Sequence, residues 1–321
     1  MNSYKNKKVW VTGHNGMVGS ALLRSLVNED CEVLVTSRAE LDLSDGSKVR
    51  SWLAQNRPDF IFHAAAKVGG INANQMHPGD FIRENLQTQL NVIDGAREVG
   101  VKKLIFVATN CTYPSNLPDA IPEEALLSGL PDAAVRAYAI GKIAGIEMCR
   151  AYAKQYGCNF ISIIPPNLFG PGDNYHPTES HVVAGILRRA HEAKESGANE
   201  FVVWGDGTAR RELLWVGDLA DAMKFLMITN TQHDLYNIGT GRDLSIAQLA
   251  QLIIETVGFD GRIKFDRSKP NGAMRKLLDN SRISSLGWAP KVTENIGLAK
   301  AYEDFKLMIN SVNSSTKCNF D

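Results

Sequence analysis

Two residues four positions apart, Tyr138 and Lys142, form the pair in this sequence with the clearest chemical use. On a helix, side chains at this spacing lie on the same face, one turn from each other. A tyrosine hydroxyl ordinarily titrates at about pH 10, and an ammonium group beside it favours the phenolate. We therefore expect Lys142 to lower the pKa of Tyr138, so that the pair can exchange protons near neutral pH. The same spacing also arises by chance on surface helices, so its meaning depends on the rest of the chain.

A glycine-rich segment at residues 13–19 lies between a predicted strand at 8–12 and a predicted helix at 20–28. Strand, glycine turn and helix in this order are the context of a dinucleotide site, although the spacing here is GxxGxxG rather than GxGxxG. Free amides at the start of the helix bind phosphate. The residues expected to bind the cofactor here are Gly13, His14, Asn15, Gly16, Met17, Val18 and Gly19.

The end of the second predicted strand, residues 32–36, indicates which cofactor binds. NAD sites usually place an acidic residue here to bind the ribose hydroxyls, whereas this chain has Ser37 and Arg38. A guanidinium can pair with a 2′-phosphate, so the sequence favours NADP(H), with Asp42 near the adenine. A surface arginine without a ligand is the alternative.

Predicted strands and helices alternate through the first half of the chain. The strands are expected at 59–63, 103–107 and 160–164, and long helices at 80–99 and 136–156. This alternation predicts an α/β fold, a Rossmann-type doubly wound parallel sheet. Ligands bind at the carboxyl edge of such a sheet, to which the strand at 103–107 delivers Thr109 and Cys111.

The strict alternation stops after residue 168, which predicts two domains. We expect an NADP-binding Rossmann domain at 1–168, to which residues 212–240 return with a final strand at 236–239. The remaining residues, 169–211 and 241–321, are expected to form a smaller C-terminal α/β substrate domain. Its helix beginning at Ser245 has the spacing of a capping box.

The composition excludes several classes of protein. The chain has 321 residues, of which 44% are hydrophobic and 22% charged, as in ordinary globular proteins. Lys+Arg and Asp+Glu both number 35, so no net charge favours nucleic acid or a membrane surface as partner. No apolar run approaches the ~18 residues of a membrane helix, and no signal peptide is expected. The five cysteines lack metal-binding spacing, so we expect no metal site and a cytoplasmic protein.

Four features together resemble the extended short-chain dehydrogenase/reductase family, which acts largely on nucleotide sugars. They are the GxxGxxG turn, three alanines at 64–66 after a middle strand, Thr109, and the pair Tyr138 and Lys142. Longer blocks are similar to the branch that converts GDP-4-keto-6-deoxy-D-mannose to GDP-L-fucose by 3,5-epimerisation and C4 reduction. These blocks are residues 13–21, 64–71, 111–114, 138–145, 269–270 and 275–279.

The resemblance implies five catalytic residues. The C4 ketone acidifies the C–H bonds at C3 and C5, and the family exchanges these protons with a Cys and a His, here Cys111 and His181. Tyr138 and Thr109 hold the C4 oxygen, and Tyr138 donates a proton to it during reduction. Lys142 binds the nicotinamide ribose. Without the resemblance, Cys111 would be interpreted as a small buried hydrophobe and His181 as a helix cap.

The resemblance also implies the binding residues. Beyond the glycine loop, NADP(H) is expected to contact Arg38, Asp42, Leu43, Ala65, Ala108, Lys142, Pro165, Asn167, Leu168 and His181. The GDP-linked keto sugar is expected to contact Asn167, Arg189, Trp204, Arg211 and Asp279. Arginines suit a diphosphate because the guanidinium donates two hydrogen bonds in a fixed fork, and Arg188 and Arg210 are further arginines in this half.

The chain departs from the family pattern at several positions. Thr109 and Asn110 stand where the family usually has two serines, and Asn15 replaces an arginine of the glycine loop, which removes one phosphate contact. The extra methyl of Thr109 narrows the pocket. A related GDP-keto sugar, of the GDP-colitose or GDP-heptose pathways, therefore remains an alternative substrate.

Two other functions are weighed against this one. A nucleotide-sugar 4,6-dehydratase would follow the active-site Thr with Asp-Glu, whereas this chain has Asn110 and Cys111. A non-catalytic NADP-binding sensor on the same fold would tend to lose Tyr138 or Lys142, and both are present. Members of the family are typically dimers that pack through helices like those at 80–99 and 136–156, so we expect a homodimer.

Overall fold

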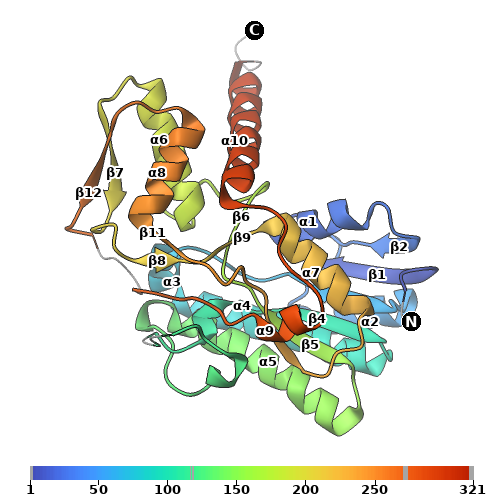
Figure 1. Ribbon diagram of the computed structural model, residues 1–321. Coiled ribbons are helices and arrows are strands. Elements are labelled where there is room, and N and C mark those ends of the chain that lie inside the picture. The colour runs from blue at the N-terminus through green and yellow to red at the C-terminus, as the bar shows by residue number, and fades with distance from the viewer. Residues whose placement is uncertain (1–2, 116, 118, 270–273, 318–321) are drawn as a thin grey trace.

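The computed structural model describes residues 3–115, 117, 119–269 and 274–317, so Pro270 of the family-like blocks lies outside the described residues. A six-stranded sheet forms its centre, with the strand order β10-β5-β4-β3-β1-β2 (Figure 1). Its strands are β1 Lys7–Thr12, β2 Cys31–Leu34, β3 Phe60–His63, β4 Lys103–Val107, β5 Phe160–Ile164 and β10 Leu235–Asn237. Every pair in this sheet is parallel, which confirms the predicted doubly wound sheet.

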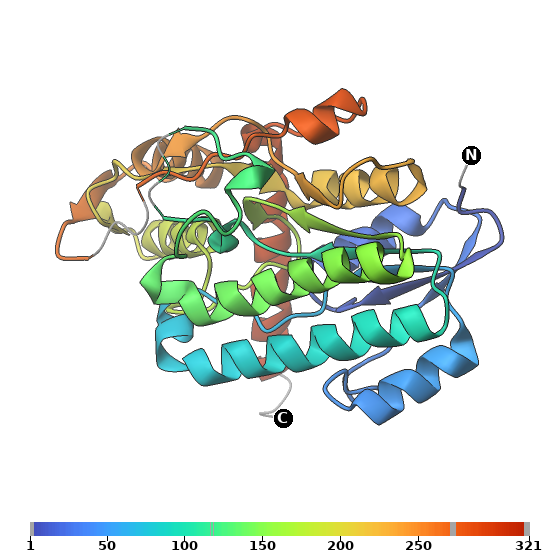
Figure 2. The same cartoon turned by 90° about the horizontal axis from the view of Figure 1, so that it is seen from below.

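Helices cover both faces of the sheet, because successive side chains of a strand point to opposite faces. In β1, Val9 and Val11 pack with α1 (Met17–Leu26) and α7 (Val216–Ile228) on one face. Trp10 points to the other face, where α2 (Gly46–Asn56), α4 (Pro78–Glu98) and α5 (Arg136–Tyr156) lie. Figure 2 shows these three helices as a row beneath the sheet.

The order of the strands locates the place where ligands bind. β1 has β2 on one side and β3 on the other, so the direction of winding reverses at β1. The loops that leave the carboxyl ends of β1 and β3 therefore diverge, and in open α/β sheets the crevice between such loops binds ligands. The loop after β1 is short, because α1 begins at Met17 rather than at residue 20 as predicted.

A second hydrophobic core lies beyond one end of the main sheet (Figure 1). It is formed by the helices α6 (Val182–Glu195), α8 (Ile246–Val257) and α10 (Glu294–Lys317) and by a parallel pair of strands at its outer edge, β7 (Glu200–Trp204) and β12 (Arg262–Asp266). The predicted capping box is confirmed at the start of α8: the Ser245 side chain accepts from the Gln248 amide, and the Gln248 side chain accepts from the Ser245 amide.

The chain passes between the two cores more than once. β6 (Asn167–Phe169) leaves the main sheet and pairs in parallel with β9 (Leu213–Trp215), which leads into α7. β10 then pairs with β5, which confirms the predicted final strand. The short elements are α3 Ile71–Met76, β8 Arg210–Arg211, β11 Leu244–Ser245, α9 Ser281–Ser285 and three 3-10 turns, Asn110–Thr112, Glu123–Ala125 and Ala133–Val135.

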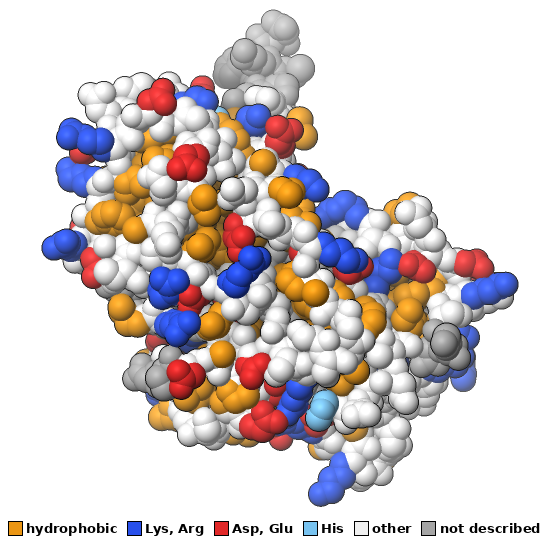
Figure 3. Space-filling view, in the orientation of Figure 1, with side chains coloured by type: hydrophobic (Ala, Val, Ile, Leu, Met, Phe, Trp, Pro, Cys, Tyr) orange, Lys and Arg blue, Asp and Glu red, His pale blue; other side chains and the backbone are white. Residues whose placement is uncertain are grey.

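The surface is mixed in charge. On the face drawn in Figure 3, Lys and Arg side chains are interspersed with Asp and Glu side chains. Within the described part of the chain, none of the helices has the length and apolar character needed to cross a membrane.

Candidate active site

A cavity of about 940 Å³ extends along the carboxyl edge of the main sheet and reaches the second core. Every residue predicted for catalysis and cofactor binding lines it, as do Asn167, Arg189, Trp204 and Arg211 of the predicted substrate site. Asp279 does not line it. The structure thus brings together, in one space, side chains that are as far apart in sequence as Gly13 and Arg211.

The glycine loop requires glycine at two places. Gly13 has a φ of +71°, and a Cβ there would lie 2.8 Å from the backbone of Ala65. A Cβ on Gly19 would lie 2.1 Å from the Gly13 carbonyl oxygen, far inside contact distance. Gly16 is the N-cap of α1 and offers no side-chain acceptor, and the first turn has no acidic residue. The amides at this helix start can therefore bind an anionic ligand.

The loop after β3 is fixed to the end of β1 by a buried histidine. The Thr12 hydroxyl lies 2.8 Å from Nδ1 of His63 and accepts a hydrogen bond of 3.2 Å from the Ala65 amide. Burial lowers the pKa of His63 to about 3, so the ring is neutral. The sequence analysis did not single out this residue, since a lone histidine at a strand end gives no distinctive pattern.

Arg38 stands at the other end of the cavity, after β2. Its side chain is 78% exposed, and its Nε lies 3.8 Å from a carboxylate oxygen of Asp42. The other oxygen of Asp42 accepts from the amide and hydroxyl of Ser44. A weak surface ion pair of this kind leaves the guanidinium able to bind a phosphate.

Tyr138 and Lys142 both lie buried on α5, on the face that meets the cavity. The Lys142 ammonium donates a 2.8 Å hydrogen bond to the carbonyl of Val107 and lies 4.7 Å from the centre of the Phe106 ring. Burial lowers the pKa of Lys142 to about 7.

The expectation that Lys142 lowers the pKa of Tyr138 is wrong in this structure. Burial raises the pKa of the Tyr138 hydroxyl above its ordinary value, and negative charge at Cys111 raises it further. Desolvation favours the neutral phenol. The lysine does not offset this effect, because its own charge is disfavoured by burial and its hydrogen bond is made to Val107. Tyr138 is thus held as a neutral phenol.

Thr109 and Cys111 lie on a tight turn after β4. The Thr109 hydroxyl oxygen accepts from the Cys111 amide at 3.3 Å, and the Asn110 amide donates to the carbonyl of Pro165. The Cys111 thiol donates to the side-chain oxygen of Asn110 at 3.9 Å. Asn110, one of the departures from the family pattern, therefore orients the thiol directly.

His181 stands at the N-cap of α6 but does not cap it with its side chain. Its side chain is free for the cavity, and burial lowers its pKa. The segment before it is tied to the loop after β3, since the Gly70 amide donates to the carbonyl of Glu179 at 3.1 Å. This hydrogen bond connects the histidine segment of the second core to the sheet that carries Cys111.

Two of the four arginines considered in the second half face the cavity. Arg189 stacks on Trp204, with its guanidinium carbon 5.2 Å from the ring centre, and its buried Nε has no hydrogen-bond partner among the described residues. Burial lowers the pKa of both Arg189 and Arg211. Arg188 and Arg210 instead pair with carboxylates, of Glu192 and Asp243 respectively.

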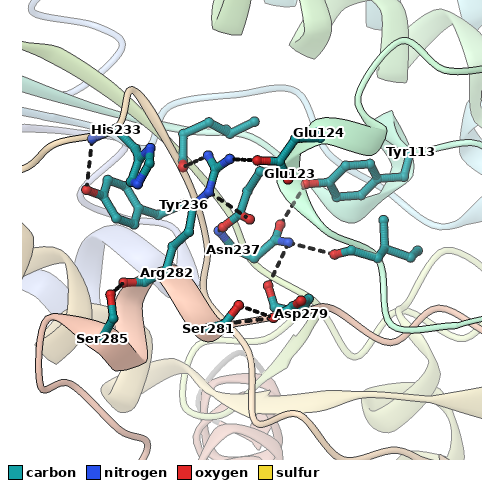
Figure 4. Close-up of polar contacts among 12 residues, drawn as sticks. Tyr113, Glu123, Glu124, His233, Tyr236, Asn237, Asp279, Ser281, Arg282 and Ser285 are labelled. Atoms are coloured by element: carbon teal, nitrogen blue, oxygen red, sulfur yellow. Dashed lines mark hydrogen bonds and ion pairs between the residues drawn. The ribbon is translucent and has the colours of Figure 1, made fainter.

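Asp279 belongs to a separate network, drawn in Figure 4. Its carboxylate accepts from the amide and hydroxyl of Ser281, and its backbone carbonyl accepts from the side-chain amide of Asn237. Three residues earlier, Lys276 is buried and lines the cavity. Lys276 therefore joins the residues that line the cavity, and Asp279, outside this lining, stays a predicted substrate contact.

Comparison with known proteins agrees with this geometry. The sequence profile of the NAD dependent epimerase/dehydratase family matches residues 9–239. The chain is 48% identical to a GDP-L-fucose synthase of Sinorhizobium fredii, over 93% of this chain and 95% of that protein. The fold is similar to that of a GDP-6-OMe-4-keto-L-xylo-heptose reductase from C. jejuni, with a TM-score of 0.89, 32% identity and coverage of 96% and 100%. A GDP-L-fucose synthetase from Naegleria fowleri bound to NADP superposes with a TM-score of 0.88, 27% identity and coverage of 97% and 96%.

Proposed function

The chain belongs to the NAD dependent epimerase/dehydratase family, and on this premise we propose that it has the activity of a GDP-L-fucose synthase. It converts GDP-4-keto-6-deoxy-D-mannose to GDP-L-fucose, by epimerising C3 and C5 and then reducing the C4 ketone. The observation that carries the proposal is one cavity in which Tyr138 and Thr109 stand together with Cys111 and His181. A reductase needs the first pair, and an epimerase also needs the second.

NADP(H) is the cofactor in this proposal, and the residues present fit it. The glycine loop and the uncapped start of α1 suit a pyrophosphate, and the exposed Arg38 suits a 2′-phosphate. The cofactor, when bound, supplies the hydride. Ala65, Ala108, Lys142, Pro165, Asn167 and Leu168 line the same cavity and continue the binding surface toward Tyr138.

Epimerisation is proton exchange at carbons next to a ketone. Cys111 and His181 exchange protons with C3 and C5, since a thiol and an imidazole both titrate within reach of neutral pH. Burial lowers the pKa of His181, so the imidazole is ready to accept a proton. The hydroxyls of Tyr138 and Thr109 donate hydrogen bonds to the C4 oxygen, on which the negative charge of the enolate develops.

Reduction uses the same hydroxyl of Tyr138. When the ketone receives hydride at C4, its oxygen becomes an alkoxide and takes a proton from Tyr138. Burial raises the pKa of Tyr138, so the proton remains on the phenol until the alkoxide forms. Lys142 lines the same cavity one helical turn away, and since burial lowers its pKa to about 7, it can return a proton to the phenolate.

The substrate is a sugar linked to a nucleoside diphosphate. Arg189 and Arg211 carry positive charge into the second core, where burial lowers the pKa of each. An anion between them would offset this desolvation, and the guanidinium fork matches phosphate oxygens. Trp204, 47% exposed and stacked on Arg189, adds a flat surface at this end.

A related GDP-keto sugar is the second candidate substrate, favoured by Asn110. This side chain lies at the Cys111 thiol, where a smaller serine would leave more room. The similar C. jejuni reductase acts, by its name, on a GDP-linked keto heptose. A non-catalytic sensor is disfavoured, because Tyr138 and Lys142 both face the cavity.

The domain division and the assembly also belong to this proposal. We assign NADP(H) to residues 1–168 with 212–240, and the GDP-sugar to 169–211 with 241–321. A homodimer through α4 and α5 is supported by exposed apolar side chains on these helices, Leu86, Leu90 and Ile140. We place the enzyme in the cytoplasm, where a thiol such as Cys111 stays reduced.

The test supplies GDP-4-keto-6-deoxy-D-mannose and NADPH and follows cofactor oxidation and the product sugar. Absence of NADPH oxidation with this substrate would refute the GDP-L-fucose assignment, and oxidation with a GDP-keto heptose instead would establish the second candidate. Oxidation that yields only GDP-rhamnose would refute the epimerase half. Cys111→Ser is expected to stop solvent deuterium from entering C3 and C5 while NADPH binding survives.

A further inference from the structure

Lys276 is a buried lysine at the active site to which the proposed mechanism gives no role. Its side chain is 7% exposed and lines the cavity. Its ammonium donates a 3.2 Å hydrogen bond to the backbone carbonyl of Asn110, the residue directly before Cys111. A lysine at this position holds the tight turn on which the thiol stands.

Burial is the main cause that lowers the pKa of Lys276, and an anion nearby would offset this loss of hydration. Among the described residues no carboxylate forms an ion pair with it. The groups whose charges act on it are Cys111 and Asp132, which raise its pKa, and Arg211, which lowers it. The charge of Cys111 in turn acts on Lys276, Arg211 and the hydroxyl of Tyr138, which line the same cavity. Electrostatic coupling is reciprocal, so an ammonium that gains from a thiolate also stabilises that thiolate.

A rigid network fixes Lys276 against the Cys111 turn. Asn237 accepts a 2.7 Å hydrogen bond from the hydroxyl of Tyr113, two residues after Cys111. Its amide group donates to the carbonyl of Asp279, three residues after Lys276, and to the carbonyl of Ile121 (Figure 4). The buried carboxylate of Glu123 in turn accepts a hydrogen bond from the backbone N–H of Asn237 and pairs with Arg282.

A second carboxylate holds the same segment from the other side. Glu212, next to Arg211, accepts a 2.8 Å hydrogen bond from the Leu278 amide. Ile121 also pairs with Leu278 in an isolated bridge. With Leu278 and Asp279 held, the backbone that follows Lys276 is fixed by contacts outside the cavity, and the Lys276 side chain extends to the Asn110 carbonyl.

We propose that Lys276 is a positioning residue for Cys111, which fixes the Asn110–Thr112 turn and offsets the charge of the thiolate when Cys111 gives up its proton. This inference deepens the proposed function and rests on it for the role of Cys111. The step balances without a further reactant: the proton leaves the thiol for the substrate carbon, and the sulfur keeps the electron pair beside the ammonium.

The first test needs no substrate and so stands apart from the proposed function. Iodoacetamide alkylates the thiolate, and peptide mass spectrometry gives the rate at Cys111 as a function of pH. In Lys276→Met we expect labelling at neutral pH to slow about tenfold and the midpoint of the pH profile to rise by about one unit. Lys276→Arg should label at nearly the wild-type rate. Lys264→Met, which removes an exposed lysine of β12 that pairs with Glu200, should label as wild type.

A further variant separates the effect of the Lys276 charge from that of its hydrogen bond. It also replaces Lys276→Met in the test if that variant does not fold. Lys276→Gln keeps a donor for the Asn110 carbonyl but carries no charge. A raised midpoint in Lys276→Gln supports the proposal. A midpoint equal to that of wild type in both Lys276→Met and Lys276→Gln overturns it, because a purely structural lysine would leave the profile unmoved.

The second test follows deuterium from solvent into C3 and C5 of GDP-4-keto-6-deoxy-D-mannose. Lys276→Met should exchange about tenfold more slowly at neutral pH and recover at higher pH, while NADPH binds within twofold of wild type. Exchange lost together with NADPH binding would show general damage and overturn the proposal. If Cys111 of the wild type is alkylated as expected but no deuterium enters C3 and C5 of the substrate, the proposed function is refuted and the result on the thiolate still stands.

Discussion

Glu212 allows a prediction whose magnitude follows from the structure. Its carboxylate is fully buried and accepts hydrogen bonds from the amides of Thr240, Gly241 and Leu278, and no residue that the structure describes forms an ion pair with it. Burial raises its pKa from the ordinary 4.5 to about 7. The folded protein therefore binds this proton more tightly than the unfolded chain, by about 3 kcal/mol.

The sign of the pH dependence follows directly. For an acid whose folded pKa is raised, the contribution to stability is fully present below about pH 4.5 and is lost as the pH rises through about 7. In Glu212→Gln this dependence disappears, because the amide does not titrate. In this variant the side-chain NH2 group of the glutamine faces the Leu278 N–H, so one hydrogen bond is lost. This loss lowers the free energy of unfolding by about 1–3 kcal/mol at every pH.

Urea unfolding of both proteins at pH 5, 6, 7 and 8 measures the effect. We expect Glu212→Gln to be clearly less stable than wild type at pH 5, and the difference to shrink by about 2–3 kcal/mol toward pH 8. Glu200→Gln, an exposed carboxylate of β7, is the control and should show a nearly constant difference. A difference between Glu212→Gln and wild type that stays constant from pH 5 to pH 8 would refute the reasoning.

Three further predictions concern the cavity. Tyr138→Phe should lower the rate of NADPH oxidation by at least about 10²-fold without changing NADPH affinity, because the phenol supplies the proton. If the variant and the wild type oxidise NADPH at equal rates, this role is excluded. Gly19→Ala should abolish NADPH binding measured by fluorescence, because the new Cβ would meet the Gly13 carbonyl, whereas Gly79→Ala, with open space around it, should bind normally. Arg38→Met should weaken NADPH binding about tenfold or more and leave NADH binding unchanged, and a parallel loss for both cofactors would contradict 2′-phosphate recognition.

The sequence predicts much of the fold because the relevant signals are local. Alternating apolar strands, the glycine turn and the capping box of Ser245 and Gln248 each act within a few residues, and all are found in the structure. The helix over residues 136–156 is found with the same ends, since Gly157 stops it in a left-handed conformation.

What sequence reasoning missed depends on three-dimensional neighbours. Within the segment 275–279, Lys276 lines the cavity, which the sequence analysis did not predict, and a hydrogen bond from Asn237, 42 residues away from Asp279, holds this segment. The direction in which the pKa of Tyr138 shifts depends on burial, and the Tyr-x-x-x-Lys spacing does not predict burial. Glu212 gives no signal in the sequence because its three donors come from two distant loops.

Residues 216–237 return to the main sheet, and this affects how the protein folds during its synthesis. The apolar face of β1 is covered by α7, and the edge of β5 is covered by β10, both from residues 216–237. A nascent chain that ends near residue 168 therefore leaves the α7 side of Val9 and Val11 and the free edge of β5 exposed to solvent. During synthesis, the main sheet is therefore completed only after residues 216–237 have been made. Separate expression of the two halves should give an aggregating first half, rescued only when residues up to Asn237 are included.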